Sequence, residues 1–147
     1  MSTLSAAIDA SASALNAERT RIEVAVSNIA NADSTRGPDG QPYRRRDVVL
    51  AADTPHGFDV ALGQAGVGRV PVTGVKVAGI VEDQSPFQRR YDPSHPDADN
   101  EGFVAMPNVD TPEEMVNMLS ASRAYQANLT AIGLIRDTIQ RALDLAK

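Results

Sequence analysis

The stretch from residue 111 to residue 146, TPEEMVNMLSASRAYQANLTAIGLIRDTIQRALDLA, decides the fold. Thr111 and Glu114 fit the two ends of a helix-capping box, and Pro112 suits the first helical position, where its missing N–H costs nothing. Apolar residues then recur with helical spacing, which predicts a C-terminal helix about 50 Å long. One face of this helix carries Met115, Leu119, Ser122, Leu129, Ile132, Ile139 and Leu143, with Met118, Tyr125 and Ile135 beside them.

A second helical pattern runs from about residue 3 to residue 31, a stretch without Gly or Pro. Its larger apolar residues follow a heptad-like spacing, which is typical of a helix that packs along one stripe. We expect Asn31 to end this helix in the left-handed conformation, and residues 37–40 (GPDG) to prevent its continuation. The helix would be about 40 Å long. The stripe consists of Leu4, Ile8, Leu15, Ile22, Val26 and Ile29.

The segment between the two helices is rich in Gly and Pro and carries short runs typical of strands. Residues from about 52 to 74 show little patterning and are expected to form a variable loop. The chain therefore divides into an N-terminal helix (1–35), a β-rich middle segment (36–110) and a C-terminal helix (111–147), and the expected fold class is α+β. The predicted strands span residues 43–50, 75–81, 87–91 and 103–106.

The chain has few side chains suited to a large core. Aromatic residues make up 4% of its 147 residues and tryptophan is absent, although aromatic side chains bury the largest areas per residue. The β-rich segment is too small to cover two long apolar stripes, and exposed patches of that size usually mark an interface. We therefore expect the terminal helices to form a coiled-coil-like pair, or a bundle that other chains complete.

Charge and cysteine content exclude several kinds of partner. The formal net charge of −5 argues against nucleic acid, because phosphate binding depends on a positive field. The basic run Arg44-Arg45-Arg46 is followed by Asp47, and we interpret it as a solvated strand edge or a rim contact. The absence of cysteine excludes disulfides and thiolate metal sites. The N-terminus lacks the basic and apolar regions of a cleavable secretory signal, and no segment has the roughly 20 apolar residues that span a bilayer.

No motif favours catalysis. The run from Asp97 to Gly102 has the oxygen ligands and the glycine of a calcium loop, but its twelfth position is Asn108 rather than Glu. An acidic turn is the favoured interpretation, and a calcium-binding regulatory or adhesive module stays open as the alternative class. His56 and His95 lie in loops rich in Pro and Gly, whereas a catalytic base or metal ligand needs rigid support. We predict a protein that is not an enzyme and that uses no cofactor or metal.

Polar residues interrupt both helical patterns. Residues 27–31 (SNIAN) close the first helix, and residues 122–128 (SRAYQAN) lie midway along the last. A helical Asn is often exposed to solvent, but amides and an Arg at a helix interface can also fix register and partner at some cost in stability. Periodicity alone favours neither interpretation.

These motifs resemble a known family. Residues 27–32 (SNIANA) are similar to the N-terminal signature of the bacterial flagellar rod and hook axial proteins. Residues 37–44 (GPDGQPYR), 91–110 (YDPSHPDADNEGFVAMPNVD) and 114–128 (EMVNMLSASRAYQAN) resemble the proximal-rod members of that family in particular. The resemblance covers both ends of the chain, whereas residues from about 52 to 74 match no pattern and have the character of a variable insertion.

The resemblance implies a structural subunit of the proximal rod of the bacterial flagellar basal body, the periplasm-crossing drive shaft that transmits torque. Such subunits join copies of themselves and other rod subunits in a helical assembly. The flagellar type III apparatus exports them unfolded and without a cleaved signal peptide, and their terminal segments tend to fold on assembly. Another rod-type axial protein stays open as the alternative within the family.

The stripes and the motifs together predict which residues contact partner subunits. Buried area is expected from Leu15, Ile22, Val26, Ile29, Met115, Leu119, Leu129, Ile132 and Ile139. Register is expected from Asn28, Asn31, Arg123, Tyr125 and Asn128.

Overall fold

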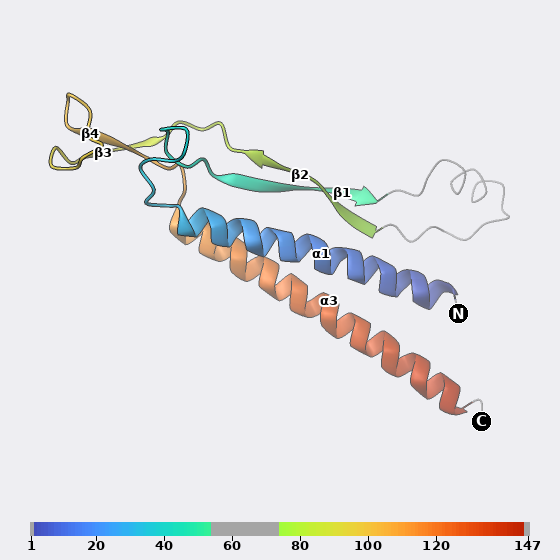
Figure 1. Ribbon diagram of the computed structural model, residues 1–147. Coiled ribbons are helices and arrows are strands. Elements are labelled where there is room, and N and C mark those ends of the chain that lie inside the picture. The colour runs from blue at the N-terminus through green and yellow to red at the C-terminus, as the bar shows by residue number, and fades with distance from the viewer. Residues whose placement is uncertain (1, 54–73, 146–147) are drawn as a thin grey trace. The chain divides into compact units, whose positions relative to one another are not determined.

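The computed structural model describes residues 2–53 and 74–145 (Figure 1). Two terminal helices with two small sheets between them make an α+β fold, as the sequence predicts. The expected variable loop lies almost entirely outside the described residues. The elements are, in chain order, α1 (Ser2–Ala30), β1 (Arg46–Asp53), β2 (Gly74–Glu82), β3 (Gln88–Tyr91), β4 (Phe103–Met106) and α3 (Thr111–Leu145).

Helix α1 has the predicted extent, but the expected conformation of Asn31 is wrong. No residue other than Gly has a positive φ within residues 2–53 and 74–145, so Asn31 is not left-handed. Its N–H donates instead to the carbonyls of Ser27 and Asn28, both at 3.2 Å, and its side-chain amide donates to the Ser27 carbonyl at 2.8 Å. These bonds satisfy the carbonyls of Ser27 and Asn28 in the last turn of the helix, so no left-handed residue is required.

Helix α3 begins where predicted, but its cap differs from the expected one. Asp110 caps the helix: its Oδ1 accepts from the Glu113 N–H at 3.2 Å, and its carbonyl accepts from the Glu114 N–H at 3.0 Å. The predicted capping box between Thr111 and Glu114 is therefore wrong, because Asp110 caps the helix one residue earlier and the Glu114 carboxylate accepts from Asn28 and Arg45 instead. Pro112 remains in the first turn, where its missing N–H still costs nothing.

All four predicted strands form. Strand β1 begins at Arg46 rather than at residue 43, and it pairs with β2 in a two-stranded sheet whose arrows are opposed in Figure 1. Strands β3 and β4 form a second, antiparallel sheet, in which Gln88 lies opposite Met106 and Tyr91 opposite Phe103. Only β4 has a buried face, through Val104 and Met106.

The loop between β3 and β4 requires a glycine at position 102. Gly102 has a φ of 82°, a conformation that residues with a Cβ rarely adopt. A Cβ there would also lie 2.9 Å from Cε2 of Tyr91. The Tyr91 ring packs edge-on against Phe103, with 5.2 Å between the ring centroids, so the close approach of Gly102 belongs to a packed aromatic pair.

The chain forms two compact units. The first contains residues 1–19, 50–78 and 122–147, and the second contains residues 20–49 and 79–121. Ala17 is the buried apolar side chain of the first unit among the residues that the structure describes there. The buried apolar side chains of the second unit are those of Ala25, Val104, Met106, Pro107, Val109 and Ala121.

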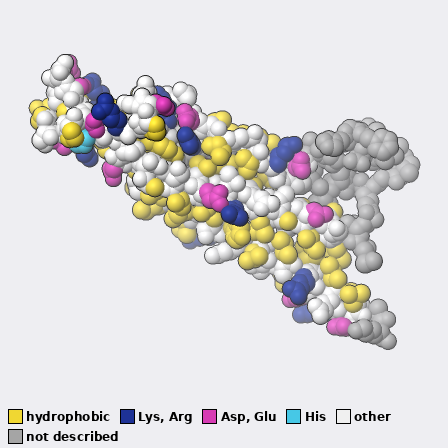
Figure 2. Space-filling view, viewed as in Figure 1, with side chains coloured by type: hydrophobic (Ala, Val, Ile, Leu, Met, Phe, Trp, Pro, Cys, Tyr) yellow, Lys and Arg dark blue, Asp and Glu magenta, His cyan; other side chains and the backbone are white. Residues whose placement is uncertain are grey.

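Large apolar side chains are exposed along α3, where Figure 2 shows them in yellow. Within the part of the chain that the structure describes, neither helix combines the length and the apolarity needed to cross a membrane. The exposed apolar side chains of α3 are Met115, Val116, Leu119, Leu129, Leu134, Leu143 and Leu145.

Candidate assembly site

A cluster of polar side chains joins α1, the start of β1 and the start of α3 in the second unit. We call it the polar junction, and it consists of Asn28, Tyr43, Arg45, Asp83, Asn108 and Glu114. Asn28 and Glu114 are 1% and 2% exposed. Buried polar groups must be hydrogen-bonded to be tolerated, so the contacts of these two residues decide whether the junction stabilises the fold.

The side-chain amide of Asn28 uses all of its hydrogen-bonding capacity. Its Nδ2 donates to the Arg46 carbonyl and to Oε2 of Glu114, both at 2.8 Å. Its Oδ1 accepts from the Tyr43 hydroxyl at 2.9 Å and from the Arg46 N–H at 3.0 Å. Asn28 thus connects α1 to the first residue of β1 and to the first turn of α3.

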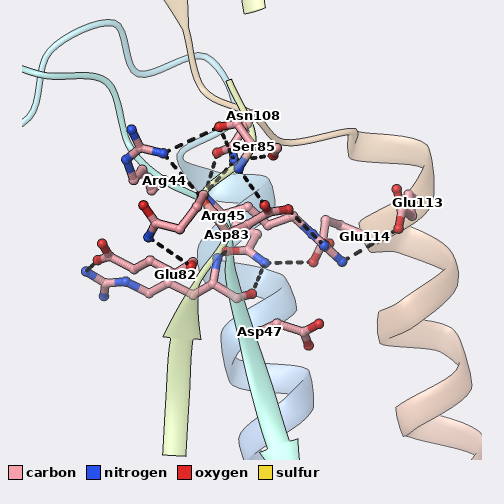
Figure 3. Close-up of polar contacts among 12 residues, drawn as sticks. Arg44, Arg45, Asp47, Glu82, Asp83, Ser85, Asn108, Glu113 and Glu114 are labelled. Carbon is pink, nitrogen blue, oxygen red and sulfur yellow. Dashed lines mark hydrogen bonds and ion pairs between the residues drawn. The ribbon is translucent and has the colours of Figure 1, made fainter. Parts of the chain in front are cut away.

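The carboxylate of Glu114 is paired with a positive charge. Nε of Arg45 donates to Oε1 of Glu114 at 2.7 Å, which is a short, charge-assisted hydrogen bond. Figure 3 shows the Arg45 guanidinium beside the carboxylates of Glu113 and Glu114. The hydrogen bond to Glu114, with the charges of Glu114 and Glu113, raises the pKa of Arg45 above its ordinary value, against the lowering effect of burial. Arg45 therefore stays charged and neutralises the buried acid.

The remaining members of the junction hold Arg45 in place. The Arg45 N–H donates to Oδ1 of Asn108 at 2.9 Å, and its guanidinium lies 3.5 Å from Oδ2 of Asp83. Asn108 donates in turn to the Asp83 carbonyl and to the Ser85 hydroxyl. Arg45 is therefore held at its backbone by Asn108 and at its guanidinium by Asp83, as a charge in a partly buried site requires.

The basic run therefore has a different role from the one predicted. Only Arg46 matches the interpretation as a solvated edge, because it is exposed and pairs with Glu82 at 3.4 Å. Arg44 lies over the ring of Phe87, 4.3 Å from the centroid, and Arg45 belongs to the junction. Arg45 and Glu114 are the important residues that sequence reasoning missed, since the assumed capping box gave Glu114 another task.

The acidic turn between β3 and β4 uses its carboxylates within the protein. Asp97 accepts from the Thr35 hydroxyl at 2.8 Å. Asp99 accepts from the backbone of Glu101 and Phe103, and these bonds lower the pKa of Asp99 below its ordinary value. Nδ1 of His95 accepts from the Asp97 N–H. Among the described residues no group of acids and histidines is arranged to hold a metal ion.

The predicted contact residues fall into three groups by exposure. Asn28 is buried in the junction. Val26, Met115, Leu119, Arg123 and Leu129 are exposed. Leu15, Ile22, Ile29, Asn31, Tyr125, Asn128, Ile132 and Ile139 are half-buried.

The amides of the helical motifs do not share one environment. Asn128 donates to the Ala124 carbonyl of its own helix, much as Asn31 bonds to its own helix. Only Asn28 connects different elements. Of the amides in the two motifs, only that of Asn28 is therefore buried inside the second unit.

The part of α3 in the first unit presents an uncovered apolar surface. Both buried residues of α3, Glu114 and Ala121, belong to the second unit. From residue 122 to residue 145 no side chain is buried. Four leucines there are between about half and nine-tenths exposed: Leu129 (55%), Leu134 (64%), Leu143 (59%) and Leu145 (89%). Such an apolar surface is typical of a protein interface.

Two family models match the helical ends of the chain. The model described as flagella basal body rod protein matches residues 8–38, and the model described as flagellar basal body rod FlgEFG protein C-terminal matches residues 100–145. The first match contains Asn28, and the second contains Glu114 and the exposed leucines. Both descriptions define the same class, the rod proteins of the flagellar basal body.

Relatives narrow the class to one family. The flagellar basal-body rod protein FlgC of Salmonella typhimurium is 46% identical over 139 residues, which cover 95% of each chain. FlgC of Bacillus subtilis is 41% identical over 144 residues, 95% of this chain and 96% of the relative, and FlgC of Borreliella burgdorferi is 40% identical over 154 residues, 95% of each. The chain belongs to the FlgC family of flagellar basal-body rod proteins, and it is a structural subunit of the rod.

Proposed function

We propose that this subunit builds the proximal rod by packing the exposed faces of α1 and α3 against copies of itself and other rod subunits. The observation that carries the proposal is the uncovered second part of α3, in which no residue from 122 to 145 is buried and four leucines are exposed. A contact between different faces of identical subunits generates a helical filament when its rotation does not close. One uncovered helix face is enough to start such a contact.

The energy available to this contact comes from the apolar side chains. Burying the exposed part of one leucine contributes about 1 kcal/mol, since full burial of such a side chain contributes about 1.5–3 kcal/mol. In a filament each subunit makes the contact repeatedly, so small gains add up over neighbours. Buried area in the contact with partner subunits comes from Val26 on α1 and from Met115, Leu119 and Leu129 on α3. Arg123, which is also exposed on α3, supplies specificity.

The proposal extends to the place and state of the chain. The rod crosses the periplasm as a drive shaft that transmits torque, and the chain reaches it unfolded through the flagellar type III export apparatus. It acts mechanically and not as an enzyme. The names of its relatives, all flagellar basal-body rod proteins, support this role.

A pair of surface substitutions tests the proposal. Leu129→Asp with Leu143→Asp places two charges on one side of the exposed part of α3, and because both side chains are exposed, the isolated chain should keep its fold. In cells that lack the wild-type chain, the variant should be produced at normal levels but should fail to build a rod or to restore swimming. The matched control is Gln126→Asp with Gln140→Asp, which adds the same charges at exposed polar positions of α3. Normal swimming with the leucine variant would contradict the proposal.

A further inference from the structure

We propose that Asn28 is a positioning residue. Its side-chain amide sets the register of α1 against both β1 and α3. Nothing in the sequence distinguishes this amide from the others of the two helical motifs. The structure does, because Asn28 alone among them is buried and connects three elements.

Asn28 pairs with the backbone of one residue of β1. Its Nδ2 donates to the Arg46 carbonyl at 2.8 Å, and its Oδ1 accepts from the Arg46 N–H at 3.0 Å. The amide thus occupies the place of a neighbouring strand at the residue where β1 begins. Only a planar group with a donor and an acceptor side by side can make both bonds, so this contact specifies an Asn at one position of α1.

The bond from Asn28 to α3 can run in one direction only. Oε1 of Glu114 accepts from Arg45 and Oε2 accepts from Asn28. An ionised carboxylate only accepts, so residue 28 must donate to it. This requirement fixes the orientation of the Asn28 amide and leaves Oδ1 for the Tyr43 hydroxyl and the Arg46 N–H.

Neighbouring residues of α1 cannot replace Asn28. Sliding the helix by one residue turns it by about 100° and brings Ser27 or Ile29 to the junction. A hydroxyl offers one donor where two are needed, and an isoleucine offers none, so the backbone of Arg46 and the buried carboxylate of Glu114 would lose partners. Losing the partner of a buried polar group is costly, and a shifted register is therefore disfavoured.

The register matters for assembly, and this consequence rests on the proposed function. Within the second unit, Val26 on α1 and Met115 and Leu119 on α3 are exposed. A partner subunit that contacts both helices requires these side chains at a fixed spacing along the pair. The Asn28 amide sets that spacing, although it has no accessible surface of its own with which to touch a partner.

The test reverses the hydrogen bond between the two residues. Asn28→Asp removes both donors of position 28, and Glu114→Gln alone supplies a donor that faces another donor. In the double variant Asn28→Asp with Glu114→Gln, the new amide nitrogen at position 114 can donate to the new carboxylate at position 28, while the amide oxygen still accepts from Arg45. Thermal unfolding of the purified chain should show a lowered melting temperature in each single variant. The double variant should recover at least half of the loss caused by Asn28→Asp, leaving only the Arg46 carbonyl without its donor.

A matched control and a milder variant keep the test decisive. Asn31→Asp makes the same change three positions later, where the amide bonds only to its own helix, and should shift the melting temperature much less. If the variants at position 28 do not fold, Tyr43→Phe removes one of the four bonds and should give a measurable but smaller shift. A double variant no more stable than the worse single variant would overturn the proposal, as would an Asn28→Asp chain that unfolds with the wild type.

Swimming adds a readout that separates this inference from the proposed function. The double variant should restore swimming relative to Asn28→Asp if register governs assembly. Recovery of thermal stability without recovery of swimming would uphold the positioning role and contradict its link to assembly. Because the melting experiment uses the isolated chain, its result does not depend on rod formation.

Discussion

The two parts of helix α3 differ in how many of their residues are buried. From residue 111 to residue 121 the helix buries Glu114 and Ala121 and pairs its acid with Arg45 and Asn28. From residue 122 to residue 145 it buries no residue, and its side chains of Asn128, Thr130 and Thr138 donate to carbonyls of their own helix. One continuous helix therefore has a first part that is fixed by buried polar contacts and a second part that buries no residue, whereas exposed apolar side chains occur on both parts.

This difference separates specificity from affinity. Directional hydrogen bonds between buried groups tolerate few alternative arrangements, so they suit the part of the subunit that must be the same in every copy. Exposed leucines are less selective and gain free energy with any apolar neighbour. A subunit that must be identical in itself but adaptable toward several neighbours benefits from this division along α3.

The largest expected effect comes from removing the charge that neutralises Glu114. Arg45→Ala leaves the buried carboxylate with Asn28 as its main partner and should lower the free energy of unfolding by about 3 kcal/mol, as measured by urea titration. Adding Glu114→Gln to the same chain should recover much of this loss, since the buried group is then neutral. Arg36→Ala, which removes a more exposed ion pair with Asp97, serves as the control and should change stability by at most about 0.5 kcal/mol. Equal instability of the single and double variants would show that Arg45 acts by packing alone.

The second effect concerns the hairpin of the second unit. Gly102→Ala should lower the free energy of unfolding by about 1–2 kcal/mol, because the backbone there is left-handed and the new methyl group meets the Tyr91 ring. Gly40→Ala separates the two causes, since Gly40 has a φ of 75° but nothing within 4 Å of the new Cβ. Urea titration should place Gly40→Ala between Gly102→Ala and the wild type. The opposite order would rule out a contribution from the contact with Tyr91.

A weaker effect is expected in the first unit, where Ser13 of α1 connects to β2. The Ser13 hydroxyl accepts from the Val75 N–H at 3.0 Å and donates to the Ala10 carbonyl at 2.7 Å. Ser13→Ala leaves the Val75 N–H without this partner and should lower the free energy of unfolding by about 1 kcal/mol. Ser11→Ala, a half-buried serine of the same helix, is the control. Hydrogen exchange should show faster exchange at Val75 in the Ser13 variant only, and unchanged exchange would refute the assignment.

The smallest effect is a dependence on acid. Hydrogen bonds from the Ser94 hydroxyl lower the pKa of Asp92, and those from the Phe103 backbone lower the pKa of Asp99. A group with a lowered pKa in the folded chain contributes stability above the unfolded pKa of 3.8, and that stability is lost as the pH falls from 3.8 through the folded pKa. Asp92→Asn with Asp99→Asn should therefore lose less stability than the wild type between neutral pH and pH of about 3. Equal losses would mean that other carboxylates dominate.

The helices and the strands were predictable because each rests on a local pattern. The apolar spacing from residue 111 onward predicts α3, and the absence of Gly and Pro before residue 31 predicts α1. The four strands were also found, with β1 beginning a few residues late because Arg45 bonds to the side chain of Asn108. These features depend on neighbours in the sequence.

The polar junction was not predictable, because its partners are far apart in the chain. Asn28 and Glu114 are 86 positions apart and Arg45 and Glu114 are 69 apart, and periodicity carries no information about such pairs. Asn28 was singled out by its motif, but nothing showed that its amide would turn inward. Glu114 was predicted to cap its own helix. Its carboxylate pairs instead with Arg45, far away in the sequence, because Asp110 already caps the helix. The remaining predicted contact residues stay predictions until assembly is tested.

The chain has three tyrosines and no tryptophan, so its intrinsic fluorescence comes from tyrosine. Tyr43 donates to Asn28, Tyr91 is exposed in the β3–β4 hairpin, and Tyr125 is half-buried on the far part of α3. Replacing any two by Phe leaves a single natural fluorophore in one region. Emission from each such chain would report separately on the junction, the hairpin and the leucine-bearing part of α3 as a subunit passes from solution into the rod.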